Sequence, residues 1–215
     1  MSIHNSIESR IRSMHPQQVF TLSDFEDLAE VKTVSKVMMR LCYDGQVRKL
    51  YRGIFCRADA SALPPERIAK AIGRANSWYI IPSGETVLYL YGLRSEAPAV
   101  WTYLTDGTSR EYEVEGVRIA FRHASLGAFR SLSGPVVLLV QVFKAVGKNY
   151  VTDPLLRQIA SRLQPEETRV IAEESAKTPG WISSTISRMM RLIPAGKNNN
   201  DDQSEGIKHG TGSVS

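Results

Sequence analysis

Cysteine and histidine are scarce in this sequence, and the few present are poorly placed for metal binding. The chain contains two cysteines, Cys42 and Cys56, and four histidines among its 215 residues. No Cys-x-x-Cys pair occurs, and no histidine lies at metal-ligand spacing from a cysteine, an acidic residue or another histidine. The sequence therefore indicates neither a zinc site nor a disulfide framework. We expect a reducing cytoplasm as its location, no metal and no cofactor.

Long apolar runs and glycine-rich phosphate loops are missing as well. The longest strongly apolar run, PVVLLVQVF at 135–143, is too short to cross a bilayer, and the first residues lack the apolar segment of a signal peptide. No Gly-rich segment ends in Lys-Ser/Thr, so no nucleotide-binding motif is present. The acidic pairs at 166–167 and 173–174 are typical of a solvated helix face. We therefore expect no membrane partner, no catalytic residues and no enzymatic activity.

Basic residues are plentiful and unevenly distributed. The formal net charge of the chain is +5. Residues 1–31 carry two basic and five acidic side chains, a net charge of −3, whereas residues 32–57 carry seven basic and one acidic side chain, a net charge of +6. A local basic patch of this kind favours an acidic partner such as nucleic acid.

The first 60 residues show the element order of a winged helix-turn-helix domain. Apolar residues recur at helical spacing from Ile3 to Met14, and a short helix capped by Thr21 or Ser23 is expected next. A third helix begins near 30–32 and ends at Gly45, which suits a left-handed C-terminal cap. Two short strands then turn near 52–53. We predict a winged helix-turn-helix DNA-binding domain over 1–60.

The remainder of the chain predicts a second, mixed domain over 64–193. Alternating residues between 100 and 125 indicate a small antiparallel sheet, and four helices follow at 135–147, 154–163, 166–177 and 180–193. Residues 78–93 fit either a short strand with a Ser83-capped helix or a second strand. The segment 194–215 has little to bury and is predicted to be a disordered tail. The predicted fold class is α+β.

The third helix carries the candidate DNA surface. Its apolar residues between 34 and 41 bury one face, which turns the polar face outward, as in a recognition helix that enters the major groove. The following ribbon adds cations where a wing contacts phosphates. An ordinary solvated charged face is the competing interpretation. The predicted DNA-contact residues are Thr33, Ser35, Lys36, Arg40, Arg48, Lys49, Tyr51 and Arg52.

A second candidate surface lies in the sheet. Arg118 and Arg122 are expected on one strand face, where arginine suits a protein interface or phosphate. The competing interpretation is an exposed sheet face with solubilising arginines.

Residues 6–56, SIESRIRSMHPQQVFTLSDFEDLAEVKTVSKVMMRLCYDGQVRKLYRGIFC, resemble the N-terminal module of the AbiE-type antitoxins of type IV toxin–antitoxin systems, which act in abortive infection and phage defence. The likeness continues through IPSGETVLYLYGLRSEAPAVWTYLTDGTSREYEVEGVRIAFRH at 81–123 and covers roughly 3–193. It implies an antitoxin that represses its own operon and counteracts a nucleotidyltransferase toxin. The eight positions above would contact DNA, and Arg118 and Arg122 would suit the basic surface that the family's C-terminal domain can add.

This resemblance leads to specific expectations about partners. We expect double-stranded operator DNA with an inverted repeat as the ligand, bound by a dimer or a larger assembly. Two alternatives stay open at this point. One is a stand-alone winged-helix transcriptional regulator, and the other is a protein-binding module without DNA activity.

Overall fold

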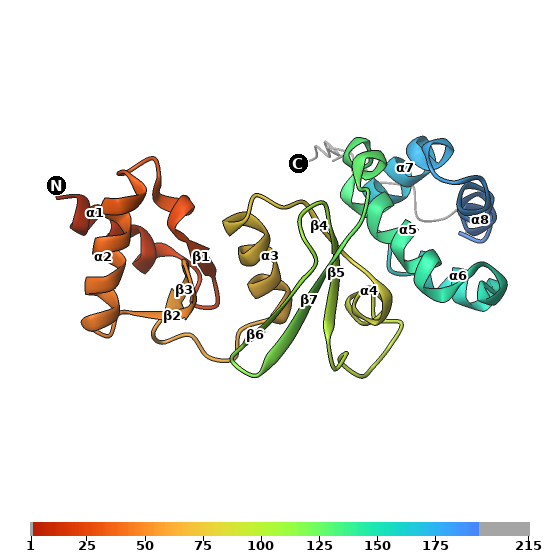
Figure 1. The fold of residues 1–215 in the computed structure, drawn as a ribbon. Helices are drawn as coiled ribbons and strands as arrows, with labels where there is room; N and C mark the ends of the chain where they lie inside the picture. Colours follow the sequence, from red (N-terminus) through yellow and green to blue (C-terminus); the bar gives the residue numbers. More distant parts are fainter. Residues whose placement is uncertain (1, 194–215) are drawn as a thin grey trace, which may run out of the picture.

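The computed structural model describes residues 2–193, which form an elongated α+β molecule. Three parts follow one another along its length (Figure 1): an N-terminal part, a central sheet with helices α3 and α4, and a C-terminal group of helices. The α+β class predicted from the sequence is confirmed. The predicted tail at 194–215 lies outside the described residues. No helix within 2–193 is long and apolar enough to cross a membrane.

The N-terminal part combines two α-helices with a three-stranded antiparallel sheet of order β1-β3-β2. Its core contains α1, α2 and the inner face of the sheet, with Phe20 stacked on Phe55 and Phe25 edge-on to Phe20. In chain order its elements are α1 (Ile3–Ser13), β1 (Val19–Thr21), the 3-10 helix η1 (Leu22–Phe25), α2 (Val31–Tyr43), β2 (Val47–Tyr51) and β3 (Ile54–Arg57).

Two local predictions for this part were wrong. The expected short α-helix is the single 3-10 turn η1, which is closed by a hydrogen bond of 2.7 Å from the Thr21 backbone N–H to Asp24 Oδ2. The segment before it, between the first two predicted helices, was predicted to contain no strand, yet it forms β1, which pairs with β3 so that Val19 faces Cys56. All three residues of β1 are buried, so the strand lacks the alternation that reveals a half-buried strand.

Helix α2 and the ribbon agree with the sequence prediction. Val34, Met38 and Leu41 are fully buried, which fixes the face that α2 turns to the core. The helix ends before Gly45, whose φ of +67° lies in the left-handed region that glycine adopts without strain. Strands β2 and β3 then form a hairpin around Arg52-Gly53, with a register irregularity between Lys49 and Tyr51.

The central part is a four-stranded sheet with one helix, α3, between it and the N-terminal part (Figure 1). The strand order is β4-β5-β7-β6. Residues 78–93, for which two assignments were open, form a short strand followed by a helix that begins after Ser83. The elements are α3 (Pro65–Ala75), β4 (Ile80–Pro82), α4 (Gly84–Leu90), β5 (Trp101–Thr105), β6 (Arg110–Val114) and β7 (Val117–His123).

The predicted purely antiparallel sheet was wrong, because β5 pairs with β7 in parallel. Strand β7 buries three successive residues, Ile119, Ala120 and Phe121, in keeping with its inner position between β5 and β6. Strand β6 is mostly exposed and lies at the edge. The chain therefore passes from β5 to the edge strand β6 and then returns as β7, which lies between β5 and β6.

The C-terminal part is helical, and the four helices predicted there are confirmed. Together with Val87 of α4 they enclose a buried cluster in which Phe143, Ile159 and Ile186 are fully buried. The elements are the 3-10 helix η2 (Gly127–Ser131), α5 (Gly134–Val146), η3 (Lys148–Tyr150), α6 (Asp153–Ala160), α7 (Pro165–Glu174), η4 (Ser175–Lys177) and α8 (Gly180–Arg191).

One buried cluster joins the N-terminal part to the central sheet. It includes Val19 and Ile54 from the N-terminal sheet, Ile72 from α3, and Trp101 and Phe121 from the central sheet. The predicted boundary at 58–64 does lie in a connecting loop, but apolar packing is continuous across it. We therefore expect the two parts to depend on each other for stability.

Candidate nucleic-acid interface

The outward face of α2 carries cations without ion-pair partners. Lys36 and Arg40 are exposed, and neither forms a salt bridge with any described residue between 2 and 193. Met39 is 55% exposed and Tyr43 is 92% exposed. The structure thus presents a basic face with solvent-exposed apolar side chains on the helix that the sequence singled out.

Thr33 and Ser35 flank this face on different sides. At about 100° per residue, two positions separate them by about 160° around the helix axis. Both side chains are half-buried. Only Ser35 lines the groove described next. Thr33 lies on the side of α2 away from this groove, and it could contact a ligand only from that side.

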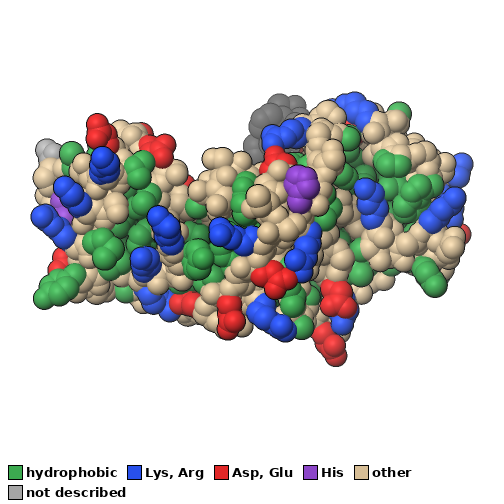
Figure 2. Space-filling model, in the orientation of Figure 1, with side chains coloured by type: hydrophobic (Ala, Val, Ile, Leu, Met, Phe, Trp, Pro, Cys, Tyr) green, Lys and Arg blue, Asp and Glu red, His purple; other side chains and the backbone are tan. Residues whose placement is uncertain are grey.

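A groove with a volume of about 730 Å³ separates α2 from the ribbon turn and the edge of the central sheet. It is open to solvent and contains four of the predicted DNA-contact residues. Figure 2 shows Lys and Arg side chains spread over the N-terminal and central parts of the visible face, with hydrophobic side chains between them. The lining includes Ser35, Met39, Lys49, Tyr51, Arg52, Arg110 and Tyr112, together with one carboxylate, that of Glu26.

The ribbon turn is held in place by the central sheet. The ring of Tyr51 packs edge-on against Tyr112 of β6, with 5.2 Å between ring centroids. Gly53 has a φ of +73°, which allows the tight turn after Arg52. The side chains of Lys49 and Arg52 are exposed, and neither has an ion-pair partner in the described part of the chain. The turn therefore offers two free cations from a fixed position.

Arg48 has different contacts from its neighbours in the ribbon. Its Nη1 lies 2.6 Å from Glu115 Oε1 in the β6–β7 turn, and its Nη2 donates a hydrogen bond of 3.1 Å to the Ala60 carbonyl. Because both terminal nitrogens are engaged, the guanidinium connects the ribbon to the central sheet. Its predicted role in DNA contact would require these contacts to be exchanged for phosphate.

Arg110 lies in the same groove, although the sequence did not single it out as a contact residue. Its guanidinium lies over the Tyr112 ring, 5.9 Å from the ring centroid. Arg110 and Tyr112 share one face of β6, where they lie opposite Phe121 and Ile119 of β7. The two-residue spacing was visible in the sequence, but the approach of β6 to α2 depends on tertiary packing.

Arg118 and Arg122 lie on the other face of the central sheet. They are exposed and alternate with Ile119 and Phe121, which are buried on the α3 side. Arg122 pairs with Glu111, and Arg118 lies opposite Glu113 in the strand register. The structure therefore separates these two arginines from the groove and places carboxylates beside them.

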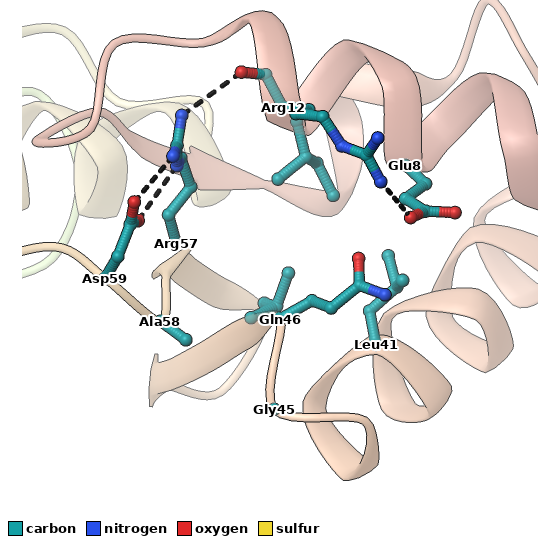
Figure 3. Close-up of a pocket in the computed structure, with 10 residues that line it drawn as sticks. Glu8, Arg12, Leu41, Gly45, Gln46, Arg57, Ala58 and Asp59 are labelled. Carbon is teal, nitrogen blue, oxygen red and sulfur yellow. Dashed lines mark hydrogen bonds and ion pairs between the residues drawn. The ribbon is translucent and has the colours of Figure 1, made fainter.

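A second cavity, with a volume of about 320 Å³, lies between α1, the end of α2 and the end of β3 (Figure 3). Arg57 donates two hydrogen bonds to Asp59, of 2.9 and 2.6 Å, and another to the Arg12 carbonyl. The pKa of Asp59 is lowered chiefly by the hydrogen bond from Arg57. Arg12 pairs with Glu8. The charged side chains around this cavity are therefore paired with one another. The hydrogen bond from Arg57 to the Arg12 carbonyl connects β3 to α1.

The thiols show no sign of activation. Burial raises the pKa of both Cys42 and Cys56, which keeps the thiols protonated. Within residues 2–193, no group of three or more His, Cys, Asp or Glu side chains is arranged to hold a metal ion.

The chain belongs to the family of unknown function DUF6088, whose model matches residues 6–171. Among solved structures it is similar to the RV2827C protein from Mycobacterium tuberculosis, with 14% sequence identity and a TM-score of 0.41 over 88% of this chain and 76% of that one. A likeness this distant carries no argument about function. A comparison with curated proteins gives no match.

Proposed function

We propose that this protein is a winged-helix DNA-binding protein that represses its own operon and acts as an antitoxin toward a nucleotidyltransferase toxin. In this proposal α2 is the recognition helix, the β2–β3 hairpin is the wing, and η1 with the following turn stands in for the second helix. The duplex lies along the outward face of α2 and reaches the mouth of the groove.

One observation carries the DNA-binding part of this proposal. Lys36 and Arg40 on α2 and Lys49 and Arg52 on the ribbon are exposed, and none forms an ion pair with another residue described in the structure. Arg48 differs from them, because it pairs with Glu115 and donates a hydrogen bond to the Ala60 carbonyl. Unpaired cations on two adjacent elements suit phosphates, which release counterions when neutralised.

The different contacts of Arg48 and Arg52 give a matched test within the ribbon. Arg52→Ala is expected to weaken binding to the DNA upstream of the gene and to make the slope of log K against log salt less steep by about 0.9. Arg48→Ala is expected to leave that slope unchanged and to lower the free energy of unfolding by about 1 kcal/mol through its lost contacts. Fluorescence anisotropy across a salt series and urea denaturation measure the two effects. If Arg48→Ala changed the salt slope and Arg52→Ala only lowered the stability, then Arg48 and not Arg52 would contact the DNA.

The antitoxin part of the proposal rests on the resemblance of roughly 3–193 to AbiE-type antitoxins. Its test is co-expression with a nucleotidyltransferase encoded beside the gene. Full-length protein is expected to restore growth of cells that produce the toxin, and Lys36→Ala with Arg40→Ala is expected to restore it equally because these residues lie in the DNA-binding part. A neighbouring toxin that remains lethal in the presence of the antitoxin would leave a stand-alone regulator as the better account.

A further inference from the structure

A third cavity, of about 420 Å³, lies at the free edge of the central sheet, away from the α2 groove. Among residues 2–193, strand β4 pairs only with β5, and all three of its residues line this cavity. Helix α3 forms one wall with Glu66 and Lys70, and α4 and α5 form the other. Its volume lies within the range typical of small-molecule sites.

The walls of this cavity are mostly apolar. Ile80 and Ile81 form the strand side, and Leu90 and Leu138 stand on the helices opposite them. Leu90 is 41% exposed, so the apolar wall reaches the solvent on this side. The surface therefore favours an aliphatic or aromatic ligand.

One buried polar group in this cavity lacks a partner. Tyr103 of β5 lines the cavity and is 2% exposed, yet its hydroxyl has no hydrogen-bond partner among the described residues. Buried hydroxyls in folded proteins are nearly always hydrogen-bonded, because an unmade bond is costly. Burial raises the pKa of Tyr103, and the Glu66 carboxylate raises it further. The hydroxyl therefore keeps its proton at physiological pH and can donate a hydrogen bond.

The two charged side chains at the edge of the cavity have opposite signs. Glu66 and Lys70 lie one helical turn apart on α3 and contribute one charge of each sign. Such an arrangement does not select a strongly charged ligand. It contrasts with the α2 groove, whose lining includes Lys49, Arg52 and Arg110.

We propose that this cavity binds a neutral, largely apolar small molecule that carries a hydrogen-bond acceptor, and that the Tyr103 hydroxyl, which is enclosed in the cavity wall, becomes accessible on binding and donates to that acceptor. The site is separate from the proposed nucleic-acid interface. Ligand binding at this site can therefore be tested separately from DNA binding and from antitoxin activity.

The probe for this site is acetophenone, compared with ethylbenzene, which lacks the carbonyl, and with benzoate, which is charged. In titrations of the full chain followed by NMR amide shifts, acetophenone is expected to bind more tightly than either and to shift residues of β4, α4 and α5. Tyr103→Phe is expected to weaken acetophenone binding about two- to tenfold and to leave ethylbenzene binding unchanged. Tyr112→Phe, a buried tyrosine of the same sheet outside the cavity, is the matched control and is expected to change neither.

Two further variants test the location of the site and the role of the Tyr103 hydroxyl. Leu90→Trp, which fills the cavity from a partly exposed position, is expected to abolish the acetophenone shifts. Without any probe, Tyr103→Phe is expected to leave the melting temperature unchanged or raise it, since it removes an unsatisfied hydroxyl. Equal affinity for acetophenone and ethylbenzene, absence of binding by both, or a melting temperature lowered by Tyr103→Phe would each overturn the assignment.

Discussion

Replacing Lys36 and Arg40 together with alanine is expected to weaken binding to the DNA upstream of the gene on the order of 30-fold at 0.15 M salt. Each cation that neutralises a phosphate contributes about 0.9 to the slope of log K against log salt, so the slope should become less steep by about 1.8. Both side chains are exposed and point away from the buried face of α2. Their removal should therefore leave the melting temperature nearly unchanged.

The control for this variant removes the same charge from a distant surface. Lys148 and Arg157 are exposed cations of the C-terminal helical part. Alanine at both positions is expected to leave the affinity and the salt slope close to those of the unmodified protein. An equal loss of affinity in both double variants would mean that net charge, and not the α2 face, governs binding.

Replacing Ile72 with alanine is expected to lower the free energy of unfolding by about 2–5 kcal/mol. Ile72 is fully buried on α3, in the cluster that joins the N-terminal sheet to the central sheet. Since a domain is stable by only about 5–15 kcal/mol, one such change removes a large fraction of that stability. Urea denaturation followed by circular dichroism measures the loss.

Hydrogen exchange would show where Ile72→Ala acts. Because one buried cluster spans both parts, protection should fall together in β1–β3 and in β5–β7. Ile186→Ala is the matched control, as Ile186 is equally buried in the cluster that the C-terminal helices form with α4, and its effect should centre on α4–α8. If Ile72→Ala lowered protection in the central sheet alone, the N-terminal part would be an independent unit.

The sequence was sufficient where a single element determines its own structure. The apolar spacing of α2 and the glycine at 45 define the helix, its buried face and its end, because both signals are local. The same holds for the β2–β3 hairpin and the C-terminal helices. The outward direction of Lys36 and Arg40 follows directly from that spacing.

Features that depend on distant contacts could not be predicted in this way. Strand β1 is buried on both faces and therefore shows no alternation, and the position of β7 beside β5 reflects burial within the sheet. The same limit applies to the candidate site. The engagement of Arg48 by Glu115 and the entry of Arg110 into the groove both depend on how the central sheet packs against the ribbon. Sequence spacing gives no information about such packing.

We propose that α2 and the ribbon form a sequence-specific DNA-binding surface. Its most direct test is a footprinting titration of the full-length protein on the DNA upstream of its gene, compared with a shuffled duplex of the same length. We predict protection of an inverted repeat at protein concentrations that leave the shuffled duplex unprotected, with affinity falling steeply as salt is raised. Equal protection of both duplexes, or none at any concentration, would contradict the claim.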